Sequence, residues 1–528
     1  MVDQSKLSGE TRQVTRAAAL ISIGNIISRA LGLIRDMAQS YFFGAGGAVS
    51  AFNIASQVPT MLYDQLVGGM LNSSLVPVFS DYASDNDADG LWHLLSNMLS
   101  VVSIFLGAVV VLLEFFAPWV ARALGKGLPP EFLELATQMI RITAPAVFFL
   151  NIAGLLSAAL YGLRRFTLPA FTAAIYNATV LVVIVLFGRG ALGTRTLAVG
   201  LLAATMTQTL FQLPGLRGIQ LRFRSPFPLH PAWVQIARLY LPIGLGLLVD
   251  LFAGVLSYNI ASRTGESGIS WMKYAATLIQ FPLGLVVTAV SVAILPTLSR
   301  YATDDNEEAF RLTLAQGMRL VLVLVLPAAV GLLILAEPLV ALLFQRGEFM
   351  PSDTIATASA LRFSILGLIF AALDQPLVFS FYARKDTWTP ALVGVVTVIA
   401  YIFMALIPTY YHPPRLWELI LVNSLKLTLH AILMLVLFNR RIGSLKPYHV
   451  WRTAWIALAA SGVMALPLVG ILRLLRDIGS SGSLGYLIRI FVASGVGGAV
   501  YLLILRLMHV HDIALVGKAL RNSESSKS

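Results

Sequence analysis

The 528-residue chain contains no cysteine and few charged side chains. Without cysteine it can form no disulfide, use no thiol nucleophile and build no thiolate metal site. Only 12% of its residues are Asp, Glu, Lys or Arg, whereas 57% are hydrophobic. A soluble protein of this length could not cover its surface with so few polar groups.

Sequence patterns of common enzymes are also missing. There is no Walker A sequence for ATP and no HExxH pair for zinc, and the seven histidines are scattered. We therefore expect no enzymatic activity, no cofactor and no metal site.

Long apolar runs occur along the whole chain, and the mean hydropathy is +0.79. Runs of about 18 residues or more predict membrane-spanning helices. We predict about 14 of them, at 17–42, 48–80, 92–122, 133–163, 167–188, 195–217, 236–262, 269–299, 311–344, 354–383, 387–409, 416–438, 450–473 and 484–507. The expected fold class is an all-α polytopic membrane protein.

The distribution of basic residues predicts the orientation. With the N-terminus inside, the cytoplasmic segments hold more Lys and Arg than the outer loops, so both termini are expected in the cytoplasm. The acidic segment 80–90 disagrees, but acidic residues carry little weight in this rule. The net charge of +12 then indicates contact with anionic membrane lipid, and no nucleic-acid partner is expected.

An internal repeat is visible in two pairs of segments. LVPVFSDYAS (75–84) resembles ILPTLSRYAT (294–303), and LYGLRRFTLPA (160–170) resembles FYARKDTWTPA (381–391). Repeated halves are common in secondary transporters. The sequence thus predicts two six-helix lobes plus two C-terminal helices. Their expected bounds are a tail at 1–16, lobes at 17–225 and 226–445, two helices at 446–508 and a tail at 509–528.

The first predicted span carries three charges, Arg29, Arg35 and Asp36. A charge inside the bilayer is costly and is a functional hypothesis by default. One interpretation is a water-filled cavity whose guanidinium groups bind an anion such as phosphate. The alternative is a structural Arg–Asp pair that joins two helices.

Four further charges lie inside predicted spans and have two interpretations each. Asp64 could pair with Arg35 or take part in ion coupling. Lys273 could contact substrate or extend to the membrane surface. Asp250 and Asp374 are candidate sites for a proton or Na⁺, and either could instead be a satisfied structural carboxylate.

Several stretches resemble the MurJ/MviN family: SRALGLIRD with FGAGGAVSAFN, LVPVFSDYA, SWMKYAATLIQFPLG, LLFQRGEF and FYARKDTWTP. They follow one another in order over nearly the whole chain. The resemblance implies a lipid II flippase of the multidrug/oligosaccharidyl-lipid/polysaccharide exporter superfamily. Such a protein moves the undecaprenyl-diphosphate-linked peptidoglycan precursor across the bacterial plasma membrane by alternating access, and its last two spans form a groove for the lipid tail.

The resemblance also implies roles for individual residues. Arg29 and Arg35 match a pair of arginines that the family needs, and Asp36 follows them. We therefore expect Arg29, Arg35 and Asp36 to bind the diphosphate head group. Cell-wall synthesis enzymes are possible partners, and Na⁺, H⁺ or the membrane potential remain open as the driving force.

The chain departs from the family pattern at three positions. Arginines of the family fall on Tyr63 and Thr277, and an acidic residue falls on Ser50. Lys273, one turn before Thr277, is our candidate for the replacement charge. The departures leave two alternatives open: a transporter of another polyprenyl-linked glycan or amphipathic cargo, and a cell-wall scaffold that does not transport.

Overall fold

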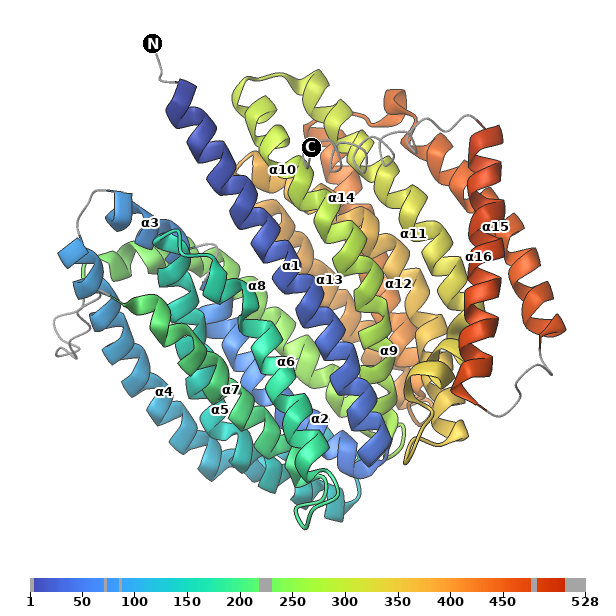
Figure 1. Cartoon of the computed structure of the whole chain (residues 1–528), viewed down its shortest axis with the longest axis horizontal. Helices are drawn as coiled ribbons and strands as arrows, with labels where there is room; N and C mark the ends of the chain where they lie inside the picture. The colour runs from blue at the N-terminus through green and yellow to red at the C-terminus, as the bar shows by residue number, and fades with distance from the viewer. Residues whose placement is uncertain (1–3, 71–73, 85–87, 218–229, 476–481, 509–528) are drawn as a thin grey trace. The chain divides into compact units, whose positions relative to one another are not determined.

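The computed structural model describes residues 4–70, 74–84, 88–217, 230–475 and 482–508. Every regular element in these ranges is helical (Figure 1). The first eight α-helices are α1 (Gln4–Phe43), α2 (Gly47–Tyr63), α3 (Val76–Ser84), α4 (Ala88–Gly125), α5 (Pro130–Gly162), α6 (Thr167–Phe187), α7 (Arg195–Gln212) and α8 (Ala232–Ser262). The other eight are α9 (Gly268–Pro282), α10 (Thr288–Thr303), α11 (Glu307–Phe344), α12 (Pro351–Ala383), α13 (Trp388–Leu406), α14 (Leu416–Arg441), α15 (Val450–Leu474) and α16 (Ser483–Leu507).

Twelve helical stretches of the described residues are long and apolar enough to cross a membrane. They coincide with the third to fourteenth predicted spans. The first predicted span lies on α1. The second lies on α2, the π-helix η1 (Asp64–Gly68) and α3, on both sides of residues 71–73, which are outside the described residues. The predicted all-helical membrane fold is confirmed.

Helix α1 is longer than the predicted first span. It already begins at Gln4, within the predicted tail 1–16. No proline occurs before Pro59, so no residue of this segment forces the helix to end. The predicted lobe boundary at 225/226 and the predicted tail 509–528 lie outside the described residues.

The chain divides into two compact units. The first unit comprises residues 1–270 and 347–349, and the second comprises residues 271–346 and 350–528. In the first unit α5 is the central helix, packed against α2, α4 and α7, while α1 packs on α6. Small residues along α5, such as Gly154 and Ala158, allow this close approach.

In the second unit α11 has the central position. It packs against α10, α12, α15 and α16, and α12 packs closely on α14. The last two helices, α15 and α16, lie side by side (Figure 1). The Tyr501 hydroxyl on α16 donates to the carbonyl oxygen of Val323 on α11 over 2.7 Å, and this bond fixes the pair to the unit.

The predicted repeat is confirmed by the bounds of the helices. Both α4 and α11 have 38 residues and begin 219 residues apart, at Ala88 and Glu307. Both α5 and α12 have 33 residues and begin 221 residues apart, at Pro130 and Pro351. The loops that follow α5 and α12 contain residues with left-handed backbone, φ 57° in one and 61° in the other. The two halves are thus built on one helical plan.

A π-helix recurs at the same point of each half. η1 begins at Asp64 and its counterpart η4 (Leu283–Val287) begins 219 residues later. A π-helical turn disturbs the regular backbone bonding, so its amides need partners. In η1 the Val67 N–H donates to Oδ1 of Asn151 on α5 over 3.2 Å, and Asn151 is fully buried. The Asn151 Nδ2 donates back to the Val147 carbonyl over 2.8 Å.

We predict that Asn151→Ala destabilises the protein. The change leaves the buried Val67 amide without its acceptor, which costs about 1–3 kcal/mol. The measurement is the melting temperature in detergent. Thr60→Ala serves as the matched control, because the exposed Thr60 hydroxyl bonds only to its own helix. Equal melting temperatures for Asn151→Ala and the control would contradict this role.

Candidate functional site

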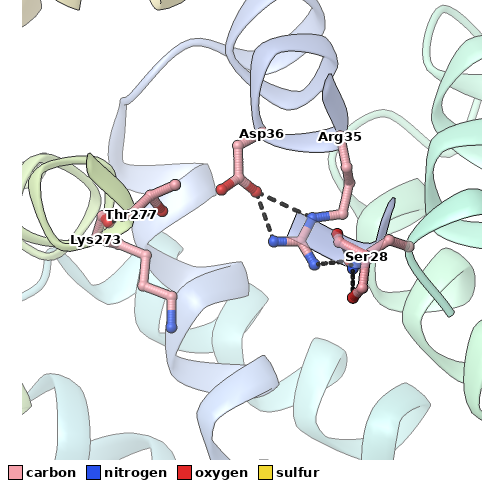
Figure 2. Close-up of polar contacts among 6 residues, drawn as sticks. Ser28, Arg35, Asp36, Lys273 and Thr277 are labelled. Carbon is pink, nitrogen blue, oxygen red and sulfur yellow. Dashed lines mark hydrogen bonds and ion pairs between the residues drawn. The ribbon is translucent and has the colours of Figure 1, made fainter. Parts of the chain in front are cut away.

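The charged face of α1 is organised around Arg35. Its Nε and Nη2 donate to Oδ1 of Asp36 over 3.0 and 2.6 Å. Its Nη1 donates to Oδ1 of Asn177 on α6 over 2.8 Å (Figure 2). These bonds engage at least three of the five guanidinium N–H groups and fix the direction of the charge.

Asn177 links the Arg35 guanidinium to the backbone of α1 through hydrogen bonds. Its Nδ2 donates to the carbonyl oxygen of Ser28 over 3.0 Å and to the Ser28 hydroxyl over 3.2 Å. Gly32 lies against this amide, since a Cβ there would be in van der Waals contact with Nδ2 at 3.5 Å. The sequence analysis missed Asn177, although an asparagine within the apolar run of α6 was a signal.

The close packing of α1 on α6 makes this network possible. A Cβ at Gly24 would lie 2.1 Å from the carbonyl oxygen of Ala170, so the two backbones meet where only glycine fits. The contact at Gly24 thus holds α1 against α6 one turn before Ser28, which accepts from Asn177.

Arg35 remains partly open although it is paired. Its side chain is 25% exposed and that of Asp36 is 11% exposed. Arg29, six residues earlier on α1, is half-buried. The structure shows the Arg–Asp pair of the second interpretation, joined to α6 through Asn177, while anion binding by Arg35 stays a prediction. The ion pair of Arg35 in the structure is with Asp36, while Asp64 is exposed at the start of η1.

Lys273 lies in the second unit, on α9, and is exposed. One turn later the Thr277 hydroxyl donates to the carbonyl oxygen of Lys273 over 3.2 Å, and the two side chains are drawn in Figure 2. Two residues before Lys273, the Trp271 Nε1 donates to Oδ1 of Asp353 on α12 over 2.8 Å. This bond fixes the start of α9 and with it the position of Lys273.

The two other departures from the family pattern are neutral residues with contacts to neighbouring helices. The Ser50 hydroxyl is fully buried and lies 3.0 Å from the hydroxyl of Ser270, which also accepts from Asn53 over 3.4 Å. The Tyr63 ring packs on α5, where a Cβ at Gly154 would lie 2.8 Å from it. Small or neutral groups therefore occupy the places where the family pattern has charges.

The remaining predicted carboxylates differ from one another. Asp250 on α8 is exposed. Asp374 on α12 instead has a basic partner, since its Oδ1 lies 2.8 Å from Nδ1 of His430 on α14. The sequence analysis did not connect these two residues, which are 56 positions apart. Among the described residues no group of three or more His, Asp or Glu side chains could hold a metal ion.

The sequence matches the family described as "Lipid II flippase MurJ" over residues 39–492. A probable lipid II flippase MurJ from Vibrio cholerae is 29% identical over 519 residues, covering 95% of this chain and 97% of the relative. One from Bdellovibrio bacteriovorus is 30% identical over 452 residues, covering 83% and 84%.

Solved structures agree on the fold. A lipid II flippase MurJ in an inward closed conformation aligns with a TM-score of 0.77 at 23% identity, covering 93% of this chain and 99% of that one. An inward-facing multidrug resistance transporter of the MATE family aligns with a TM-score of 0.69 at 17% identity, covering 82% and 99%. The chain thus shares its helical fold with these two solved structures. With a sequence match that spans most of its length, the chain belongs to the lipid II flippase MurJ family.

Proposed function

We propose that this protein is a lipid II flippase of the bacterial plasma membrane. It moves the undecaprenyl-diphosphate-linked peptidoglycan precursor from the inner to the outer leaflet by alternating access, with both termini in the cytoplasm. Family membership supports this function. The division into two compact units supports alternating access, which needs two bodies that can move.

The observation that carries the proposal is the oriented guanidinium of Arg35. The cargo has a diphosphate, and a guanidinium binds phosphate oxygens through charge-assisted bonds. Because Asp36 and Asn177 already hold the group, little conformational freedom is lost when the phosphate binds. Arg29 lies on the same helix and supplies a second cation to the head group.

The lipid tail has a separate place in this proposal. It stays in the membrane along α15 and α16, which carry large exposed apolar side chains such as Leu466 and Phe491. Tyr501 fixes these helices to α11. Cell-wall synthesis enzymes are proposed as protein partners that supply or consume the cargo.

The neutral residues Ser50, Tyr63 and Thr277 favour a second candidate. A family member that lacks charges at these positions could carry a different polyprenyl-diphosphate-linked glycan. Binding of purified protein to lipid II and to a second polyprenyl-diphosphate-linked glycan separates the two cargoes. Tighter binding of the second lipid supports this candidate, and binding of neither supports a scaffold that does not transport.

We predict that Arg29→Ala and Arg35→Ala each abolish transport. Loss of one charge-assisted bond to phosphate costs about 1.5–3 kcal/mol, or about tenfold to a hundredfold in affinity. The measurement is lipid II exposure at the outer leaflet in a strain depleted of its own flippase. Arg195→Ala is the matched control, because that exposed arginine bonds to Gln138 near the start of α7. Normal exposure in Arg29→Ala cells, with the protein present in the membrane, contradicts the head-group role.

We further predict that Lys273 and position 277 can substitute for each other. Lys273→Ala should reduce transport, and adding Thr277→Arg to that variant should restore it, because either side chain places a cation on the same face of α9. The same exposure assay measures both. If Lys273→Ala transports normally, or Thr277→Arg fails to rescue a folded Lys273→Ala protein, Lys273 does not replace the family arginine.

A further inference from the structure

An acid–base pair lies inside the second unit, between two membrane helices. The distance between Nδ1 of His430 and Oδ1 of Asp374 is 2.8 Å, and the side chains are only 17% and 18% exposed. Asp374 precedes the end of α12 at Ala383 by nine residues, and His430 precedes the end of α14 at Arg441 by eleven. At 1.5 Å per residue the pair lies about 14–16 Å from these helix ends, inside the apolar part of the helices.

Few other charges surround the pair. The neighbouring elements α13 and η4 contain none, and α10 contains only Arg300, which stacks on Tyr301. On α14, one turn before His430, the Lys426 ammonium lies 5.6 Å from the ring centre of Tyr401. On α12, the Tyr382 phenol interacts electrostatically with Asp374.

The other charges of the packed helices point elsewhere or lie near helix ends. On α11, Arg311 and Arg319 donate to the carbonyl oxygens of Ile442 and Tyr448. The remaining charged residues of α11, α12 and α14 are Glu307, Glu308, Glu337, Asp353, Arg362, Glu418, Arg440 and Arg441. Among the described residues the ion-pair partner of Asp374 is His430, so the charge of the pair depends mainly on its own protonation.

We propose that the Asp374–His430 pair binds one proton and releases it during each transport cycle. Imidazole is the side chain that ordinarily titrates in the physiological range. With Nδ1–H donated to the carboxylate, Nε2 takes the proton from water, and an imidazolium then faces a carboxylate. Release returns the proton to water and leaves a neutral imidazole whose Nδ1–H still donates to the carboxylate. Both states are therefore accessible inside the membrane.

Helix α12 can bend when the Asp374–His430 pair gains or loses a proton. Pro376 follows Asp374 by two residues and has no N–H, so the Ala372 carbonyl loses its usual partner and α12 can bend there. Between them, the Gln375 amide donates to the Thr288 hydroxyl on α10 over 3.2 Å. A change in the strength of the Asp374–His430 contact thus acts at a flexible point of α12.

The first test measures proton binding without transport. The purified full-length protein is labelled at histidine, and the imidazole NMR signals are followed between about pH 5 and pH 9. We expect one titrating signal that His430→Gln removes and Asp374→Asn shifts. His412→Gln is the matched control, because His412 lies 3.7 Å from Glu418 in an exposed loop. A His430 signal that keeps one protonation state over this range overturns the proposal.

The second test rests on the proposed function and measures lipid II transport in proteoliposomes. A proton gradient of one pH unit shifts the steady-state distribution of cargo by up to about tenfold when one proton is coupled. We expect this shift in the wild type and in His412→Gln, and its loss in His430→Gln and Asp374→Asn. A shift that survives in both pair variants, or a sodium gradient that replaces the proton gradient, overturns the proposal. Absence of any lipid II transport in the wild type, with an intact His430 titration, would count against the cargo and not against the proton site.

Discussion

A charge inside a membrane helix needs a partner, and this requirement organises both units. In the first unit Arg35 on α1 is paired with Asp36 and bonded to Asn177 on α6. In the second unit Asp374 on α12 is paired with His430 on α14. Each set of contacts joins two helices that also pack closely, so the polar groups are satisfied where water is scarce.

The two halves share a scaffold but not their chemistry. The paired helix bounds, the two π-helices and the left-handed loop residues recur at a nearly constant offset. The charged residues do not recur: Gly254 occupies the position equivalent to Arg35, and Thr209 the position equivalent to His430. The two halves therefore share a helical plan, while the oriented arginine lies in one half and the Asp374–His430 pair in the other.

The departures from the family pattern are also changes in chemistry that leave the helical plan intact. The Ser50 hydroxyl forms a hydrogen bond with a neighbouring hydroxyl, and the Tyr63 ring packs on α5. Neither position therefore holds a buried charge that would need a partner. The cations proposed for the head group are then those of α1 and Lys273.

The helices and the repeat were determined by the sequence itself. Apolar runs define membrane helices because backbone groups in lipid must bond within the segment, and no long-range information is needed for that. The repeat was visible because matched turns keep their prolines and tyrosines. Helix α1 begins before the predicted span 17–42, since hydropathy marks the membrane-embedded part of a helix and not the whole helix.

The sequence also identified Arg35, Asp36 and Asp374 as unusual, because a charge in an apolar run stands out. It did not identify their partners Asn177 and His430, which lie 142 and 56 positions away. The sequence around a polar residue in one helix does not show which residue of another helix will lie against it. Only the packing of α1 on α6 and of α12 on α14 brought these groups within hydrogen-bond distance, and that packing is set by close contacts such as Gly24 on Ala170 that no single segment specifies.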